Sequence, residues 1–283
     1  MSATRTVQGT GRASAPVPRR KVGGRLHDAF LNERLLIGAV GVTTFLVFWE
    51  VGARVGWVNT DWFASPVMVA QAGALLVQDP KFWEHAYISM YEFVVGFVLA
   101  IIIGVPLGLA AGWFTRLNYL LDPWISFFNA LPRVALIPVL ILVFGVLGPG
   151  AKVAVVFLGA FISILIVTVM GVRTVDRKFL DVATSFRASQ YRIFASVVAL
   201  ATVPFIITGL RLGMARALIG VVTAEVFLQT GGLGFLIRRF AESRNADDML
   251  FTILIFTTAG IIGVQLIRVV EKRFQRWRPE ART

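Results

Sequence analysis

The chain has 283 residues, of which 57% are hydrophobic and 16% are charged, and its mean hydropathy is +0.75. Soluble globular domains carry about 25% charged residues, so this composition excludes an ordinary soluble protein and indicates an integral membrane protein. The sequence contains no cysteine, which excludes disulfides and thiolate metal sites. The net charge of +12 is gathered beside apolar segments, so we expect membrane lipid rather than nucleic acid as the partner of these cations.

Residues 1–30 are polar and rich in Gly, Pro and Arg. They lack the apolar stretch and the small-residue cleavage site of a signal peptide. We therefore expect a basic, disordered cytoplasmic tail over residues 1–30, a membrane domain over 31–278 and a short C-terminal tail over 279–283.

Hydropathy predicts an all-α, polytopic membrane fold with about six transmembrane helices. A helix needs about 20 mostly apolar residues to cross the hydrocarbon core of a bilayer. Suitable segments lie near 35–53, 89–113, 124–146, 153–172, 197–224 and 250–267.

The second predicted span carries glycines at a helical spacing: Gly96, Gly104, Gly108 and Gly112. Residues four apart lie on one face of a helix, and glycines there form a groove that lets another helix approach closely. We expect Pro106, in the same span, to bend the helix.

Ionisable residues inside spans are candidates for a solute pathway, because a charge in the bilayer core costs about 3 kcal/mol on insertion scales. Arg133 lies in the third span between two prolines, where a broken helix can expose backbone dipoles to a cavity. Arg211, Arg216 and Glu225 lie in or at the end of the fifth span. The alternative for each is a buried pair or a contact with a second protomer.

The distribution of Lys and Arg predicts the orientation. With the N-terminus inside, the inner segments hold 19 of these residues and the outer segments hold 5, or 6 with Arg54. The positive-inside rule then places both termini and the 173–196 connection in the cytoplasm of a multi-pass membrane protein.

Residues 176–194, DRKFLDVATSFRASQYRIF, form a polar segment between two spans. Phe179, Val182, Phe186 and Ile193 fall on one stripe at the helical period, and Asp176 can cap the N-terminus. The pattern predicts one amphipathic cytoplasmic helix. From the period alone, it lies either in the lipid headgroups or against a partner protein.

The same segment resembles the cytoplasmic loop of ABC importer permeases that begins Glu-Ala-Ala. Asp181, Val182 and Ala183 stand at those three positions, and Ala188 and Ser189 match the usual Ala-Ser. Pro204 matches a proline further along the chain, while Arg187 stands where the family has glycine.

Other stretches are similar to the sulfonate/taurine/nitrate/bicarbonate branch of these permeases, and the resemblance covers residues 60–278. They are SPVMVAQA (65–72), GFVLAIIIGVPLGLAAGW (96–113), LLDPWISFFNALPRVALIPVLILVFG (120–145), GVRTVDRKFLDVA (171–183) and GLGFLI (232–237).

The resemblance implies the inner-membrane permease subunit of an ATP-driven importer for a small anionic solute. Its partners would be a cytoplasmic ABC ATPase dimer, a second permease copy or a related permease, and an extracytoplasmic solute-binding protein. The implied coupling loop spans about 174–194, and its expected ATPase contacts are Phe179, Asp181, Val182, Ala183, Phe186, Arg187, Ala188, Ser189 and Arg192. With glycine replaced by Arg187, the loop either runs as a more continuous helix or gains a charged ATPase contact.

We expect no catalytic, cofactor or metal site in the chain. GVLGPGAK (145–152) approaches a phosphate-binding loop, but Ala151 occupies the lysine position and Val153 follows Lys152. His27 and His85 lie in the tail and in a predicted loop. ATP hydrolysis is therefore expected in a separate subunit, and the chain is not expected to be an enzyme. The alternatives are a stand-alone secondary transporter or channel, and a membrane assembly or signalling protein.

Overall fold

The computed structural model describes residues 23–57, 59, 62–145 and 148–275, and every regular element in these ranges is helical. The helices are α1 (Gly23–Val55), α2 (Pro66–Leu76), α3 (Pro80–Trp113), α4 (Thr115–Ala130), α5 (Arg133–Phe144), α6 (Gly150–Arg173), α7 (Arg177–Ser185), α8 (Gln190–Ile193), the π-helical segment η1 (Phe194–Val198), α9 (Ala199–Leu228), α10 (Leu233–Glu242) and α11 (Ala246–Gln275). The described residues from Gly52 onward belong to one compact unit, and those of α1 before Gly52 belong to another.

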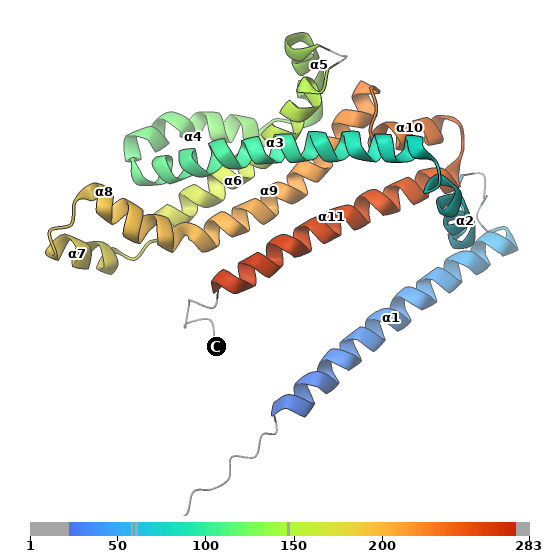
Figure 1. The fold of residues 1–283 in the computed structure, drawn as a ribbon, viewed down its shortest axis with the longest axis horizontal. Coiled ribbons are helices and arrows are strands. Elements are labelled where there is room, and N and C mark those ends of the chain that lie inside the picture. The colour runs from blue at the N-terminus through green and yellow to red at the C-terminus, as the bar shows by residue number, and fades with distance from the viewer. Residues whose placement is uncertain (1–22, 58, 60–61, 146–147, 276–283) are drawn as a thin grey trace, which may run out of the picture. The chain divides into compact units, whose positions relative to one another are not determined.

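The core of the larger unit is α6, which packs mainly against α3 and α9 (Figure 1). A central cluster of buried side chains joins the three helices: Phe97 and Ala100 from α3, Val156, Ala160 and Ile164 from α6, and Ala217 and Val221 from α9. The α7 and α8 helices lie at one end of this unit, and α2 and α10 lie toward the other. We refer to these as the α7 end and the α10 end.

Small residues allow these helices to approach so closely. A Cβ atom added at Gly96 would lie 2.7 Å from the Cβ of Val156, and one at Gly108 would lie 2.7 Å from the Cβ of Thr168. Both separations are shorter than real carbon contacts. The predicted glycine groove is therefore confirmed, and α6 is the helix that fills it.

Among the described residues, five helices are long and apolar enough to cross a membrane, and α4 with α5 would form a sixth span bent by 105°. This agrees with the predicted number of spans and with the predicted interruption of the third one, which lies at Leu131 and Pro132. Pro132 and the extended backbone before it end α4, because the residue preceding a proline disfavours the helical conformation.

Several boundaries differ from those predicted from hydropathy. The α3 helix begins at Pro80, nine residues before the predicted start, and its first turns are polar. Asp79 caps this helix by accepting a hydrogen bond from Lys81 N at 2.9 Å. The α2 and α10 helices, each only about three turns long, lie in segments predicted as connections.

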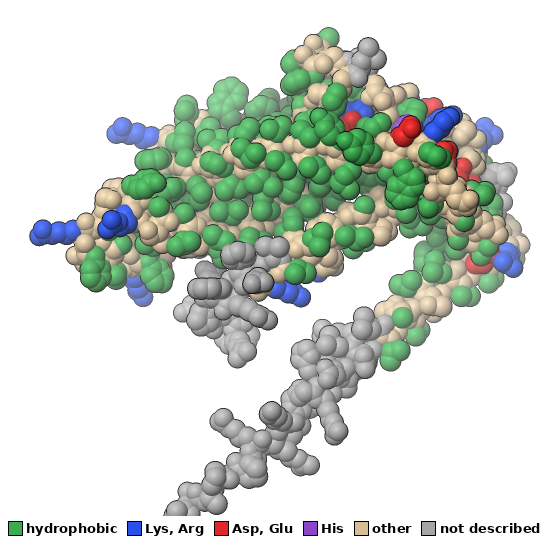
Figure 2. Space-filling model, viewed as in Figure 1, with side chains coloured by type: hydrophobic (Ala, Val, Ile, Leu, Met, Phe, Trp, Pro, Cys, Tyr) green, Lys and Arg blue, Asp and Glu red, His purple; other side chains and the backbone are tan. Residues whose placement is uncertain are grey.

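Figure 2 shows apolar side chains covering the middle of the viewed face of the larger unit, with charged side chains gathered toward its ends. Exposed apolar residues on the long helices include Ile102 on α3, Ile219 on α9 and Ile262 on α11. An apolar band between two charged ends is the surface expected of a protein that contacts lipid or another apolar subunit.

Candidate functional site

The α7 helix, within the predicted coupling loop, has no buried residue. Phe179, Val182 and Phe186 are all exposed, and Phe186 has 83% of its surface accessible. Asp176 caps the helix by accepting a hydrogen bond from Lys178 N at 2.9 Å, as predicted. The helix therefore presents an apolar stripe that this subunit leaves uncovered.

The expected single helix over 176–194 is wrong, because the chain turns after Ser185. Arg187 has φ of 53°, its N–H donates to Thr184 O at 2.8 Å, and Ala188 N–H donates to Ala183 O at 3.2 Å. This pair of hydrogen bonds around a left-handed residue is the Schellman C-cap, which favours glycine at the position of Arg187. The loop is thus not a more continuous helix, and the predicted stripe ends at Phe186, since Ile193 is buried on α8.

From Ser189 onward the chain forms one helical rod that runs through α8 and η1 into α9. Ser189 caps the rod by accepting a hydrogen bond from Arg192 N at 3.4 Å. The rings of Phe194 and Trp113 lie 5.6 Å apart, which joins the rod to the end of α3. A displacement of α7 can therefore be transmitted to the core helix α9 through a single tight turn.

The remaining predicted coupling residues are divided by exposure. Asp181, Arg187, Ser189 and Arg192 are exposed, whereas Ala183 and Ala188 are half-buried. The charged and hydroxyl side chains of this group therefore share the uncovered surface with the apolar stripe.

The four predicted pathway residues do not form one site. Arg211 lies 3.1 Å from Glu271 of α11 in an ion pair, which agrees with the alternative of a buried structural contact. Arg133, at the first turn of α5, and Arg216, on α9, lie near enough for their charges to interact. Neither has an ion-pair partner among the described residues.

Glu225 is fully buried and belongs to a polar network at the α10 end. Its carboxylate accepts hydrogen bonds from Ser89 Oγ at 2.6 Å and from Gly234 N at 2.7 Å. Ser89 Oγ in turn accepts from Leu233 N at 2.8 Å. Glu225 thus caps the first turn of α10 and ties it to α3 and α9, because the first N–H groups of a helix lack partners inside it.

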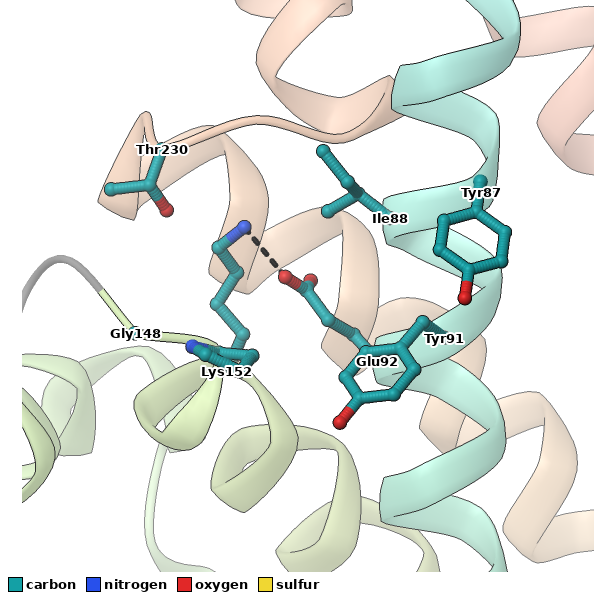
Figure 3. Close-up of a pocket in the computed structure, with 8 residues that line it drawn as sticks. Tyr87, Ile88, Tyr91, Glu92, Gly148, Lys152 and Thr230 are labelled. Carbon is teal, nitrogen blue, oxygen red and sulfur yellow. Dashed lines mark hydrogen bonds and ion pairs between the residues drawn. The ribbon is translucent and has the colours of Figure 1, made fainter.

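Lys152 and Glu92 complete this network and were not predicted as site residues. Lys152 Nζ lies 2.7 Å from Glu92 Oε1 and donates to Gly231 O at 3.0 Å, although Lys152 is only 2% exposed (Figure 3). In the sequence, Lys152 and Glu92 are charged residues in otherwise apolar segments, 60 residues apart. Each could be singled out as a candidate site residue, but the sequence does not indicate that the two form an ion pair.

His85 belongs to α3 rather than to a loop, and its Nδ1 accepts a hydrogen bond from Gly232 N at 3.1 Å. Together with the Glu225 contacts, this bond fixes the Gly231–Gly232 turn, in which both residues have positive φ. Within the described ranges, no three His, Cys, Asp or Glu residues stand together as a metal site would require.

Comparison with known proteins agrees with this architecture. The sequence profile described as "Binding-protein-dependent transport system inner membrane component" matches residues 104–276. A probable ABC transporter permease protein of Brucella abortus (strain 2308) is 31% identical over 260 residues, covering 91% of this chain and 99% of that protein. The taurine transport system permease protein TauC of Escherichia coli (strain K12) is 26% identical over 251 residues, covering 87% of this chain and 90% of TauC.

The fold is also found in a solved structure. A chain of the MetNI methionine ABC transporter in an inward-facing conformation superposes with a TM-score of 0.58, at 16% identity, covering 70% of this chain and 98% of that chain. The TauC relative confirms the resemblance noted in the sequence to the sulfonate/taurine branch. The chain belongs to the family of binding-protein-dependent transport system inner membrane components, the permease subunits of ABC importers.

Proposed function

We propose that this chain is the membrane permease of an ATP-driven importer and that α7, with the turn to α8, docks onto a cytoplasmic ABC ATPase. The observation that carries the proposal is the uncovered stripe of Phe179, Val182 and Phe186 on a helix with no buried residue. Neighbouring exposed apolar and aromatic side chains are typical of surfaces that bind a partner.

The connection from α7 to the core suits transmission of force. Docking alone would not couple ATP hydrolysis to transport. Coupling requires that the contacts between the permease and the ATPase differ between the two conformational states of the transporter. A helix held by a hydrogen-bonded turn to the α8–η1–α9 rod can move as a lever, whereas a flexible loop would absorb the displacement.

A helix lying in the lipid headgroups is the competing interpretation of α7. Such a helix would also expose an apolar stripe. Removal of the stripe should weaken association with the ATPase if α7 docks onto it, and should leave association unchanged if α7 lies in the headgroups. A reconstituted complex distinguishes the two results.

The proposed sidedness follows the Lys/Arg distribution, with the α7 end and both termini in the cytoplasm. An extracytoplasmic binding protein would then deliver the solute to the α10 end, and a second permease copy or a related permease would complete the pathway. The TauC relative supports a small anionic solute of the sulfonate, taurine, nitrate or bicarbonate type, and so do Arg133 and Arg216, which have no ion-pair partner among the described residues.

The test is co-purification of the ATPase with the tagged permease carrying Phe179→Ala or Phe186→Ala. Each change removes an anchor of the kind whose truncation weakens interfaces by about 2 kcal/mol, so we expect a roughly thirtyfold loss of affinity. Phe227→Ala is the matched control, because Phe227 is an exposed phenylalanine on α9 near the α10 end. Unchanged ATPase recovery with both α7 variants would refute docking and favour the headgroup interpretation.

A further inference from the structure

Two carboxyl groups lie beside each other in the buried network at the α10 end. Glu225 on α9 is fully buried, and Glu92 on α3 is only 1% exposed. The two carboxyl groups lie within hydrogen-bonding reach of each other. Ser89, one helical turn before Glu92 on α3, donates to Glu225 Oε1 at 2.6 Å and so holds the Glu225 carboxyl against this face of α3. Like charges at such a separation repel, and burial removes the water that would screen them.

Only one cation contacts the two carboxyl groups within the described part of the chain. The ammonium of Lys152, on α6, lies 2.7 Å from Glu92 Oε1 and donates its second hydrogen bond to Gly231 O at 3.0 Å (Figure 3). Lys152 is 2% exposed, so solvent does not compete for these contacts. With both glutamates ionised, the network would hold one uncompensated negative charge away from water.

The neighbouring titratable groups do not supply a second cation. His85 of α3 accepts a hydrogen bond at Nδ1 from Gly232 N at 3.1 Å, whereas both ring nitrogens of a charged imidazole are donors. Arg238 of α10 is paired with Glu242 at 2.7 Å and donates to Val226 O at 3.0 Å. The negative charge must therefore be removed in another way.

One oxygen of Glu92 shows how. Glu92 Oε2 is buried and has no hydrogen-bond partner among the described residues, although buried carboxylate oxygens are almost always hydrogen-bonded. A protonated carboxyl group is a hydrogen-bond donor. A single proton between the two glutamates therefore supplies the missing donor and balances the charge of the network.

The contacts of the two glutamates indicate which of them carries the proton. Glu92 touches an ammonium, which favours its ionised form. The other donors to Glu225 are neutral, namely the Ser89 hydroxyl and Gly234 N at 2.7 Å. We propose that this network is a proton-binding site, in which Glu225 carries the proton and donates it to Glu92 Oε2.

The proton joins two halves of the network. Glu225 fixes the first turn of α10 through Gly234 N, and Glu92 is fixed to α6 through Lys152. The hydrogen bond between the two carboxyl groups connects these halves, so Glu225 is a positioning residue for the start of α10. The inference does not depend on the ATPase or on the identity of the solute.

The test is infrared spectroscopy of the delipidated full-length permease at neutral pH. Dodecyl maltoside suits the sample because it has no carbonyl group to mask the C=O stretching band of a protonated carboxylic acid. We expect wild type to show such a band and Glu225→Gln to lack it. Because Glu225 is fully buried, the band should shift only slowly after transfer to deuterated water.

Two further variants assign the band. Ser89→Ala removes a hydrogen bond to Glu225 but none to Glu92, so it should keep the acid band and move its frequency. Glu242→Gln is the control, because Glu242 is an exposed glutamate of α10 in an ion pair with Arg238, and it should leave the band unchanged. A merely structural role of Glu225 would produce no acid band in wild type.

Absence of an acid band in wild type, or a band that persists in Glu225→Gln, would overturn the proposal. A band that Ser89→Ala does not move would place the proton on Glu92 and overturn its assignment to Glu225. If Glu225→Gln does not fold, the wild-type band, its slow deuterium shift and the effect of Ser89→Ala still decide the question.

Discussion

Replacement of Lys152 by methionine tests the buried network at the α10 end most severely. Methionine has a similar length and flexibility, so the change removes the ammonium with little change in shape. The variant loses the contact with Glu92 at 2.7 Å and the hydrogen bond to Gly231 O at 3.0 Å. Glu92 then remains as a buried carboxylate with no cation.

The expected destabilisation follows from these two losses. Breaking a buried ion pair by removal of one partner costs about 3–5 kcal/mol, and the orphaned carbonyl adds about 1 kcal/mol. We therefore predict that Lys152→Met lowers the free energy of unfolding by about 4 kcal/mol or more. The double variant Glu92→Met with Lys152→Met removes both charges and should recover to within about 2 kcal/mol of the wild type.

The assay is reversible unfolding of the purified chain in mixed micelles, with Lys81→Met as control. Lys81 is an exposed lysine near the start of α3, so its replacement should change the free energy of unfolding by less than about 0.5 kcal/mol. A Lys152→Met variant as stable as the control, or a double variant less stable than either single one, would show that the ion pair is not buried in the folded protein.

Three further predictions concern the other contacts. Arg187→Gly should stabilise the α7 turn by about 1 kcal/mol, because glycine adopts φ of 53° without strain. Hydrogen exchange at Ala188 N–H should then become about fivefold slower, and faster exchange would refute the strain at Arg187. Gly108→Ala should destabilise the protein by about 1–3 kcal/mol, because the added Cβ would lie 2.7 Å from its nearest atom. Gly104→Ala should destabilise it less, since the corresponding distance there is 3.3 Å. Equal unfolding free energies of the two variants would contradict the close packing at Gly108. Arg211→Met should lower the unfolding free energy by about 1–2 kcal/mol, because it removes the ion pair with Glu271. Lost solute uptake at unchanged stability would indicate a pathway role instead.

The sequence predicts those features that depend on neighbours along one helix. The glycines of α3 share a face because of the helical period, so the groove could be read from the sequence before its partner was known. The prolines around Arg133 similarly predicted the break between α4 and α5. Both signals are local, and neither requires knowledge of which helices pack together.

The turn at Arg187 was missed because its determinant is a backbone conformation that arginine rarely adopts. Glycine at this position would have indicated a Schellman cap, whereas arginine within an amphipathic pattern favours continuation of the helix. The two hydrogen bonds that close the turn hold a left-handed residue in place despite its side chain.

The polar network was missed because its members come from different helices. Lys152 sat in a near-match to a phosphate-binding loop, and Glu92 was one charge within an otherwise apolar span. Their pairing depends on the packing of α3 against α6, which the glycine groove sets. Long-range contacts of this kind follow from the tertiary fold and leave no periodic trace in either helix.

The proposed contact of α7 with a separate ATPase can be tested by cross-linking because the natural chain contains no cysteine. A single cysteine at the exposed Ser185 of α7 and, in a second variant, at the exposed Ser243 beyond α10 would be treated with a short thiol cross-linker in membranes containing the ATPase. We expect a permease–ATPase cross-link from Ser185→Cys that changes in yield when ATP is bound, and none from Ser243→Cys. Absence of the Ser185→Cys cross-link in vesicles that still import solute would refute the contact between α7 and the ATPase.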